Sequence, residues 1–496
     1  MKLDELILKS GIDTAAVYGG NAEITGVSYD SRQTKKGDLF FALPGSAADG
    51  DNFIPEAVKK GASAVASQRS HQAGVPSIKV TDIKTVMARM AEAFYGFPST
   101  KIDLYGITGT NGKTTVTYML ESIVKASGES CAVFGTVNYR FGKRIFTLPN
   151  TTAESADISR LLAEFVKSGG RRCFIEMSSQ GLDRKCAEAL TFKAGVFTNL
   201  SREHLDWHGS MENYAAAKRR LFEKVFESCG DKGLAVINSD DPWSEKILNV
   251  LPLKKVTYGI NKHADYSGKI ISMDIAGTIV EVKNSQEKIR IELKLPGEHN
   301  AMNALAAFAL AREEGFSVEI IKKGLEKLLD IKGRLSRITS EKGFTVYVDY
   351  AHTPDALEKV IRSLKPLTQK RIITVFGAGG NRDRGKRPLM GKIVFENSDF
   401  SWITSDNPRN EDPRAIALDI EVGMRKTEGA KFTDGNPPWR VELDRKKALS
   451  GAIAMAEKGD IILIAGKGHE EYQIVGEKKI PYSDIATVKK ILKTQK

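Results

Sequence analysis

Short apolar runs alternate with stretches of helical apolar spacing along most of the chain, a pattern typical of parallel sheets covered by helices. Between residues 98 and 333 the runs predict strands at 131–135, 172–177, 194–198 and 234–238 and helices at 155–167 and 211–227. Three runs at 256–260, 278–282 and 288–295 predict an antiparallel patch, followed by helices at 300–315 and 318–329. This part of the chain is therefore expected to form one mostly parallel sheet.

The flanking segments carry the same α/β pattern on a smaller scale. Before residue 97, short runs at 24–27, 39–43, 63–66 and 77–80 surround a helix near 55–61. After residue 334 we expect strands at 345–349, 371–376, 400–404 and 460–465 and helices at 354–364, 414–426 and 446–458. Because 496 residues correspond to about three domains, we predict a small α/β module at 1–97, a central P-loop-type domain at 98–333 and a C-terminal Rossmann-like domain at 334–496.

A glycine-rich turn joins the apolar run at 102–107 to a helical pattern that begins near residue 113. Such a turn lets backbone N–H groups surround phosphate oxygens at the positive end of a helix. Lys113 would reach the β- and γ-phosphates, and a threonine hydroxyl would hold magnesium. The turn predicts a site for ATP or a close relative, made by Gly109, Thr110, Asn111, Gly112, Lys113, Thr114 and Thr115.

Composition narrows the class of protein. Hydrophobic content of 41% is ordinary for a globular chain, no segment is apolar for long enough to span a membrane, and the four cysteines show no Cys-x-x-Cys spacing. We therefore expect a cytoplasmic location, without zinc or disulfides. The net charge of +12 would permit nucleic-acid binding, but the basic residues are scattered, so we expect a solvated surface with sites for phosphorylated substrates instead.

Later in the chain, Glu176, His204 and Lys218 suggest that the site binds metal ions. Glu176 ends a predicted strand, where its carboxylate could complete the magnesium coordination begun by Thr114. His204 lies with His208 in a ligand-rich loop that has no third zinc ligand at a familiar spacing, which favours a hard-metal or phosphate role. Lys218 falls on the apolar face of its helix. It could lose its proton and react with carbon dioxide to form a carbamate, or it could extend past its neighbours to solvent.

Four polar loops in the C-terminal segment follow predicted strands. Asp349 or His352 could meet a nucleotide, and the loop 377–387 has the glycines and basic side chains (Arg382, Arg384, Lys386 and Arg387) of an anion site. Arg409 offers a guanidinium suited to a carboxylate, and Glu470 could receive an ammonium group. Together these loops predict a small, charged substrate.

These motifs resemble those of the Mur ligase family, most closely its tripeptide-forming members, over essentially the whole chain. The matching segments are 30–32, 109–115, 150–152, 176–179, 199–206, 214–218, 300–303, 333–334, 349–352, 385–388, 406–409 and 466–470. The resemblance implies an ATP-dependent amide ligase of peptidoglycan synthesis, which phosphorylates the D-glutamate side chain of UDP-MurNAc-L-Ala-D-Glu. A diamino acid then attacks the acyl phosphate. We expect a monomer.

The resemblance also implies the role of each site residue. Lys113, His204 and Lys218 would be catalytic; Thr114 and Glu176 would hold one magnesium ion, and His204 and carbamylated Lys218 the second. Asn303, Arg334 and Asp349 would join the phosphate loop in binding ATP. The UDP-substrate would meet Ser31, Thr151, Thr152, Ser178 and Arg184. The incoming amino acid would meet Arg382, Asp406, Asn407, Pro408, Arg409, Gly466 and Glu470.

The arginine of the Asp-Asn-Pro-Arg motif implies meso-diaminopimelate as the incoming amino acid, because its second carboxylate needs a guanidinium. L-Lysine or another diamino acid is the first alternative, and a nucleotide-binding protein without ligase activity is the second. The chain departs from the family pattern at Gln180, where relatives usually have histidine, and at Cys186, where they have arginine. Arg184 or Lys185 would then take over the substrate contact of that arginine.

Overall fold

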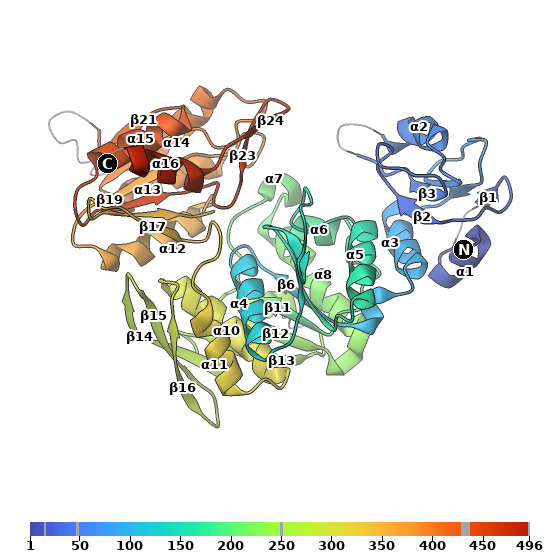
Figure 1. Cartoon of the computed structure of the whole chain (residues 1–496), viewed down its shortest axis with the longest axis horizontal. Helices are drawn as coiled ribbons and strands as arrows, with labels where there is room; N and C mark the ends of the chain where they lie inside the picture. Colours follow the sequence, from blue (N-terminus) through green and yellow to red (C-terminus); the bar gives the residue numbers. More distant parts are fainter. Residues whose placement is uncertain (14–15, 46–48, 249–250, 428–436, 495–496) are drawn as a thin grey trace.

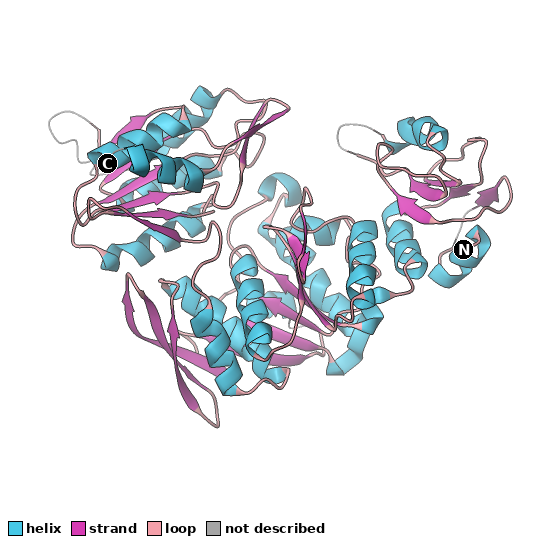
Figure 2. Ribbon diagram, viewed as in Figure 1, coloured by secondary structure: helices cyan, strands magenta, loops and turns pink. Residues whose placement is uncertain are grey.

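The computed structural model describes residues 1–13, 16–45, 49–248, 251–427 and 437–494. Three α/β parts follow one another along the molecule, with the N-terminal part and the C-terminal part on opposite sides of the central one (Figure 1). Helices lie against the main sheet of each part (Figure 2). The predicted α/β class is confirmed: sheets of five, eleven and six strands form the three parts, and two further strands pair as a separate small sheet.

The N-terminal sheet has the strand order β1-β5-β4-β3-β2, in which only β1 runs antiparallel to its neighbour. Leu3 and Leu6 of α1 and the apolar face of α3 pack into its main core. Helices α1 and α3 and strand β1 were not predicted. The elements are β1 Ala16–Tyr18, β2 Gly26–Ser28, β3 Asp38–Phe41, β4 Ala64–Ser67, β5 Ser77–Lys79, α1 Leu3–Ser10, η1 Gly50–Phe53, α2 Ile54–Lys59 and α3 Ile83–Phe94.

The central sheet has eleven strands in the order β16-β15-β14-β13-β12-β11-β6-β10-β7-β8-β9. Helices α4, α10 and α11 pack on one face and α5, α6 and α8 on the other, so the inner strands are buried on both sides. The strands are β6 Asp103–Thr108, β7 Ala132–Phe134, β8 Tyr139–Phe141, β9 Arg144–Phe146, β10 Arg172–Glu176, β11 Ala194–Phe197, β12 Leu234–Asn238, β13 Lys254–Gly259, β14 Tyr266–Asp274, β15 Gly277–Lys283 and β16 Lys288–Leu293. The helices are η2 Pro98–Lys101, α4 Lys113–Ala126, α5 Ser155–Lys167, α6 Ser179–Asp183, α7 Leu205–His208, α8 Met211–Cys229, η3 Gly230–Lys232, α9 Ser244–Leu248, α10 Glu298–Glu313 and α11 Val318–Lys327.

The predicted antiparallel patch is right in part. Strands β14, β15 and β16 pair antiparallel, but β13, predicted as part of the patch, runs parallel to both β12 and β14. The prediction was wrong because strand direction depends on the connection through α9, which the apolar pattern of the strand does not reveal. Strand β14 itself escaped prediction because much of it is exposed and a register shift interrupts its pairing at Ile270/Ser272.

The C-terminal sheet has the order β17-β18-β22-β19-β20-β21, parallel except for β17. Helices α12, α13 and α14 pack on one face and α15 and α16 on the other. Strands β23 and β24 form a separate hairpin. The elements are β17 Ser336–Thr339, β18 Thr345–Val348, β19 Ile372–Phe376, β20 Phe400–Ile403, β21 Trp439–Val441, β22 Ile461–Ile464, β23 Tyr472–Val475, β24 Lys478–Pro481, α12 Pro354–Leu364, η4 Lys365–Leu367, α13 Lys386–Asn397, α14 Pro413–Arg425, α15 Arg445–Met455 and α16 Asp484–Thr494.

Polar bonds join the C-terminal part to the central one at the carboxyl ends of the central strands. Lys386, the first residue of α13, forms a buried ion pair with Glu203 at 3.0 Å. Asp355 of α12 accepts hydrogen bonds from Asn111 Nδ2 at 2.9 Å and from Ser201 Oγ at 3.1 Å. The phosphate loop is therefore enclosed by residues of two domains.

Candidate active site

The phosphate loop lies between β6 and α4, as predicted. Gly109 and Gly112 have φ of 146° and 88°, a region that side chains rarely adopt. A Cβ at Gly109 would lie 1.9 Å from Thr198 Oγ1, and one at Gly112 would lie 2.3 Å from Asn303 Oδ1. Both positions require glycine, because the loop passes directly against its neighbours.

Two lysines meet on one carbonyl of this loop. Lys113 Nζ donates to Gly109 O at 2.8 Å, and Lys218 Nζ donates to the same oxygen at 2.9 Å. Burial lowers the pKa of Lys113 to about 8, although the charge of Glu176 opposes the shift. Burial, reinforced by the charge of Lys113, holds the pKa of Lys218 well below its ordinary value. Lys218 is only 1% exposed, so it does not extend to solvent as one of the two predictions required.

Glu176 ends β10 and its carboxylate is buried beside the start of α4. Its Oε2 accepts hydrogen bonds from Thr114 Oγ1 at 3.0 Å and from Thr136 Oγ1 at 2.8 Å. Arg334 reaches across from the C-terminal part and donates to Thr114 Oγ1 at 3.2 Å, while its buried Nε has no partner among the described residues. A hydroxyl, a carboxylate and a guanidinium thus converge beside the phosphate loop.

His204 stands immediately before α7 with a left-handed backbone (φ 56°). Burial lowers the pKa of its imidazole to about 3, and its Nδ1 has no hydrogen-bond partner among the described residues. The ring lies edge-on to Tyr214, which also contacts Lys218 Nζ at 4.6 Å from the ring centre. His208 instead bonds to Ser179 Oγ at 3.0 Å, so the two histidines differ in role.

A cavity of about 590 Å³ opens beside the loop and is lined by residues of both domains, including Asn111, Thr115, Asn303, Arg334, Asp349 and Asp355. Asp349 uses its two carboxylate oxygens on the backbone N–H groups of Leu335 and Ala351, each at 2.7 Å. Its present contacts therefore fix the chain around Arg334. Sequence reasoning missed Asp355, which lies three residues after the predicted motif 349–352, in the first turn of α12.

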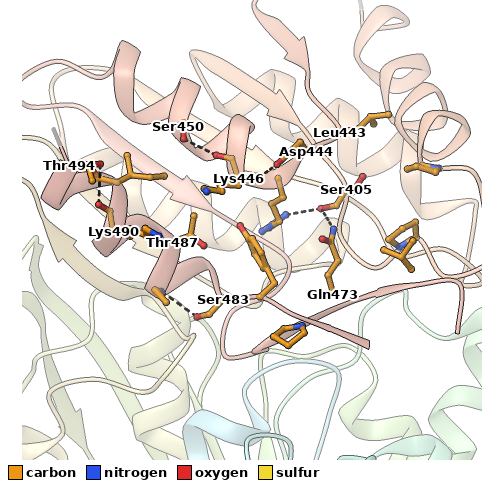
Figure 3. Close-up of a pocket in the computed structure, with 18 residues that line it drawn as sticks. Ser405, Leu443, Asp444, Lys446, Ser450, Gln473, Ser483, Thr487, Lys490 and Thr494 are labelled. Atoms are coloured by element: carbon orange, nitrogen blue, oxygen red, sulfur yellow. Dashed lines mark hydrogen bonds between the residues drawn. The ribbon is translucent and has the colours of Figure 1, made fainter. Parts of the chain in front are cut away.

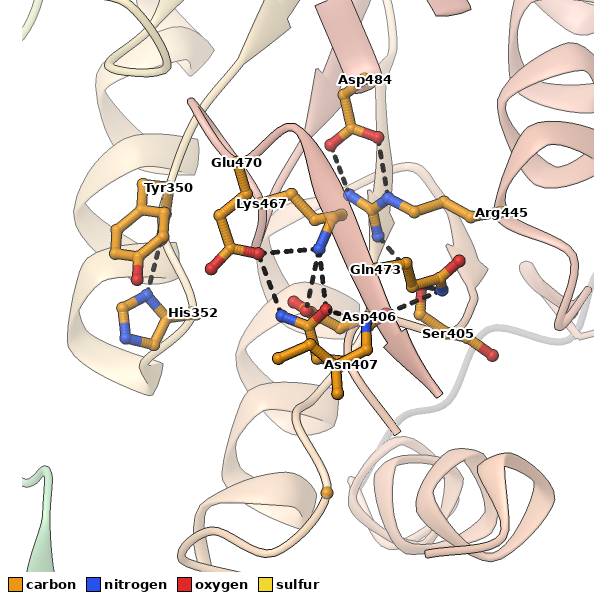
Figure 4. Close-up of polar contacts among 12 residues, drawn as sticks. Tyr350, His352, Ser405, Asp406, Asn407, Arg445, Lys467, Glu470, Gln473 and Asp484 are labelled. Atoms are coloured by element: carbon orange, nitrogen blue, oxygen red, sulfur yellow. Dashed lines mark hydrogen bonds and ion pairs between the residues drawn. The ribbon is translucent and has the colours of Figure 1, made fainter. Parts of the chain in front are cut away.

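The predicted amino-acid loops meet at one end of the C-terminal sheet, where Figure 4 shows them with their polar contacts. Asn407 Nδ2 donates to Glu470 Oε2 at 3.0 Å, and Gly466 lies so close to Asp406 that a Cβ would be 2.6 Å from Oδ2. Lys467, which sequence reasoning did not select, lies buried between these groups. Pro408 follows in the same loop, with its carbonyl against Gly380.

Arg409 and Arg382 lie near one another beside this network. Arg409 has a left-handed backbone (φ 53°) and donates to Gly380 O at 2.8 Å. Burial and the charge of Arg382 lower the pKa of Arg409. Neither guanidinium has a carboxylate within ion-pair distance in the described part of the chain, which leaves room for an anion.

Three of the four basic residues predicted for an anion loop at 377–387 have ion-pair partners within the chain. Arg384 pairs with Asp419 at 2.7 Å, and buried Arg387 pairs with the same carboxylate at 3.0 Å. Lys386 forms its buried ion pair with Glu203. Composition alone could not separate these internal pairs from free cations, because the partners come from distant segments.

The residues predicted for the UDP-substrate lie in two groups. Thr151, Thr152 and Ser178 gather near Glu176: Thr152 Oγ1 donates to the Glu176 carbonyl at 2.9 Å and lies 3.1 Å from Ser178 Oγ. Thr151 Oγ1 lies 3.1 Å from Thr136 Oγ1. Ser31 belongs to the N-terminal domain, where it donates to Glu56 at 2.7 Å.

The two departures from the family pattern have different surroundings. Cys186 is buried, and burial raises the pKa of its thiol to about 12, so the thiol stays neutral and offers no positive charge in place of an arginine. Arg184 turns to Glu154 at 3.3 Å. Lys185 pairs with Asp82 of the N-terminal domain and does not stand free. Gln180 lies half-buried in α6.

A second and larger cavity, of about 1020 Å³, lies between the β23–β24 hairpin and helices α15 and α16 (Figure 3). Of the predicted site residues it contains Pro408 alone. The larger cavity is therefore not the candidate active site, because the lysines with lowered pKa values and the phosphate loop lie elsewhere.

The described residues hold no group of three or more His, Cys, Asp or Glu side chains placed to bind one metal ion. They also hold no helix with the length and apolar character that crossing a bilayer requires.

Comparison with known proteins covers the whole chain. The profile of the Mur ligase middle domain matches residues 107–311, that of the Mur ligase glutamate ligase domain matches 333–468, and that of the Mur ligase family catalytic domain matches 23–95. The UDP-N-acetylmuramoyl-L-alanyl-D-glutamate--2,6-diaminopimelate ligase of Caldanaerobacter subterraneus is 40% identical over 494 residues, covering 99% of each chain.

Solved structures agree with the sequence comparison. A structure of UDP-N-acetylmuramoyl-L-alanyl-D-glutamate--2,6-diaminopimelate ligase superposes with a TM-score of 0.67 at 30% identity, covering 100% of this chain and 99% of that one. The MurF ligase of Thermotoga maritima, in complex with ADP, shares the fold with a TM-score of 0.66 at 18% identity, covering 95% and 98%. The phosphate loop, the two lysines on it and this full-length similarity establish that the chain belongs to the Mur ligase family.

Proposed function

We propose that this protein is the ATP-dependent ligase that joins meso-diaminopimelate to UDP-MurNAc-L-Ala-D-Glu in peptidoglycan synthesis. Full-length relatives at 40% identity are named for this reaction, which supports the proposal. The observation that carries it is the pair of guanidiniums, Arg409 and Arg382, beside Asn407 and Glu470. This arrangement offers cations for a carboxylate and a carboxylate for an ammonium, as a diamino diacid requires. We place the reaction in the cytoplasm.

The reaction needs a leaving group on an unreactive carboxylate. Transfer of the γ-phosphoryl group of ATP to the D-glutamate carboxylate gives an acyl phosphate and ADP. The amine of meso-diaminopimelate then attacks the acyl carbon, the new C–N bond forms, and inorganic phosphate leaves as the amine loses a proton. Lys113 and Arg334 would stabilise charge on the phosphoryl group, and the backbone N–H groups of the loop 109–115 would hold the β-phosphate.

Magnesium fits the residues on one side of the phosphate loop. Thr114 Oγ1 and Glu176 Oε2 are hard oxygen donors 3.0 Å apart. A single carboxylate suits Mg²⁺, which usually takes its remaining ligands from phosphates and water. Bound there, the ion would neutralise charge on the transferred phosphoryl group. The unpartnered Nδ1 of His204 is a donor for a second ion.

Lys218 would supply the anion that the second metal position lacks. A neutral Lys218 amine can add to carbon dioxide: the nitrogen lone pair forms an N–C bond, one N–H proton is released, and the product is a carbamate anion. That anion would attract the Lys113 ammonium beside it at Gly109 O, where a Lys218 ammonium would repel it. The carbamate oxygens would then face the metal beside His204.

The substrates would be divided among the three parts of the chain. We propose domains at 1–97, 98–333 and 334–496, with Ser31 of the first on the uridine end of the substrate. Thr151, Thr152, Ser178 and Arg184 would hold the muramoyl peptide beside Glu176. Asn303 and Asp349 would complete the nucleotide site. The amino-acid site would consist of Arg382, Asp406, Asn407, Pro408, Arg409, Gly466 and Glu470.

Phosphate release tests the proposed reaction. Purified protein with ATP, magnesium, bicarbonate and UDP-MurNAc-L-Ala-D-Glu should release phosphate, with matching tripeptide, when meso-diaminopimelate is added and not with L-lysine. Phosphate release with L-lysine only would support the ligase reaction but reject meso-diaminopimelate as the substrate. No phosphate release with either amino acid would reject the proposal.

A further inference from the structure

Lys467 is a fully buried cation within the proposed amino-acid site. Its side chain has no exposed surface, and its Nζ lies 2.8 Å from Glu470 Oε2, 3.1 Å from Asn407 Oδ1 and 3.8 Å from Asp406 Oδ1. A buried ammonium requires such partners, because desolvation is costly. Here all three partners are residues that the proposed function assigns to the incoming amino acid.

The contacts of Lys467 determine which way the Asn407 amide faces. Lys467 Nζ and the Ile474 backbone N–H, at 2.9 Å, both donate to Asn407 Oδ1. The amide nitrogen must therefore face Glu470 Oε2, to which it donates at 3.0 Å. One side of the Glu470 carboxylate is thus held by two donors, and its Oε1 makes no hydrogen bond within the described part of the chain (Figure 4).

The β23–β24 hairpin holds the same loop from the other side. Gln473 Nε2 donates to Asp406 O at 2.7 Å, Arg409 N donates to Ile474 O at 3.1 Å, and Gly476 N donates to Arg409 O at 2.7 Å. These bonds keep Arg409 in its left-handed conformation, which costs free energy outside such a frame. The backbone of the loop is therefore fixed by the hairpin and its polar side chains by Lys467.

The charges around Lys467 explain why Glu470 needs this lysine to stay in place. Asp406, Glu470 and Lys467 together carry one net negative charge, and the neighbouring Arg382 and Arg409 carry two positive ones. Without Lys467, the carboxylates of Asp406 and Glu470, each within 3.8 Å of its ammonium, would lose the cation that they share, and like charges repel. Glu470 would then turn away from its position beside Asn407.

From this geometry, and resting on the proposed function, we propose that Lys467 is a positioning residue that presents the free oxygen of Glu470 to the ammonium group of the incoming diamino acid. It would not touch that substrate. ATP and the UDP-substrate bind at other residues, so the loss of Lys467 should affect one KM of the three.

The test compares Lys467→Met with Lys478→Met, which removes a lysine from the exposed face of the same hairpin. Lys467→Met removes the two hydrogen bonds that the Lys467 ammonium donates to Asn407 and Glu470. We therefore expect the KM for meso-diaminopimelate to rise about 10- to 100-fold in this variant. The KM values for ATP and the UDP-substrate should stay within about twofold of wild type, and Lys478→Met should match wild type throughout. Equal KM values in the two variants, or equal increases for all three substrates, would overturn the proposal.

A second variant decides the matter if Lys467→Met does not fold. Lys467→Gln keeps a polar side chain that can still donate a hydrogen bond but removes the ammonium charge beside Glu470, so the KM for meso-diaminopimelate should again rise about tenfold while the other two KM values stay unchanged. A wild-type KM in this variant would overturn the proposal. Failure of wild-type protein to use meso-diaminopimelate would instead reject the proposed function, so the two failures are distinguishable.

Discussion

Removal of the Lys386 ammonium should weaken the contact between the C-terminal and central domains. The Lys386–Glu203 side chains are 4% and 6% exposed and 3.0 Å apart. At an effective dielectric constant of about 20, two charges at that distance attract by about 5.5 kcal/mol before desolvation is subtracted. In Lys386→Met the Glu203 carboxylate stays buried without its partner, and such a loss typically costs about 3–5 kcal/mol.

A matched control lies at the same junction. Arg202 and Asp383 are 3.7 Å apart, and the same calculation gives about 4.5 kcal/mol, so distance alone hardly separates the two pairs. The Arg202 side chain is 50% exposed, however, and water screens the attraction, so Arg202→Met should cost about 1 kcal/mol or less. Exposure, and not distance, is the variable under test.

The assay is small-angle scattering together with thermal unfolding. A cost of 3–5 kcal/mol changes the equilibrium between docked and separated domains by roughly 10²–10³-fold or more, so Lys386→Met should show a larger radius of gyration and an earlier transition. The double variant Glu203→Leu with Lys386→Met should recover much of the loss, because it leaves no unpaired charge. Equal scattering and unfolding for Lys386→Met and Arg202→Met would refute the reasoning.

Acid should act on the same pair. Burial disfavours the charged form of Glu203, but the charges of Lys386, His352 and His204 outweigh burial and lower its pKa. A lowered folded-state pKa means that the stabilisation is present above the unfolded value of about 4.3 and is lost as pH falls through the folded value. The scattering difference between wild type and Lys386→Met should therefore shrink only in acid below about pH 4.

Three further predictions concern single residues. Lys218→Ala should lower kcat at least about a hundredfold, and a short carboxylic acid should restore part of it; full turnover without rescue would contradict the carbamate. ATP affinity, measured by calorimetry, should fall as pH rises through about 8, where Lys113 loses its proton; a flat profile to pH 9.5 would contradict its role. Arg445→Leu should lower the free energy of urea unfolding of the C-terminal domain by about 3–5 kcal/mol, because buried Asp484 loses its ion-pair partner. Arg440→Leu, on the exposed face of β21, should change this free energy little.

Long, regular elements could be predicted from the sequence because their apolar pattern carries the signal. Helix α12 and strand β12 have the predicted bounds, and both bury a continuous apolar set. The short hairpins β8–β9 and β23–β24 escaped prediction, since strands of three or four residues are too short to give a detectable apolar run, and β9 and β24 are also largely exposed. Strand direction at β13 escaped for a different reason, because it depends on the connection rather than on the strand.

The candidate site shows the same division between local and distant information. The phosphate loop could be predicted because glycines and lysine occur together in the sequence. The state of Lys218 could not be decided by periodicity, since its burial depends on Gly109 from a distant segment as well as on Tyr214 of its own helix. Likewise the sequence predicted Arg387 as part of an anion site, although its guanidinium already forms ion pairs with Glu411 and Asp419. Ion pairs between distant segments are a property of the folded chain.

The bonds from Asp355 to Asn111 and Ser201 have a kinetic consequence. The cavity beside the phosphate loop has walls from two domains, so we expect ADP to leave faster once these bonds break and the walls separate. Large relative motions of domains displace solvent, and their rates fall as the solvent becomes more viscous, whereas phosphoryl transfer within a closed site does not depend on viscosity. If opening limits turnover, kcat should fall in proportion to added sucrose viscosity while single-turnover chemistry stays constant.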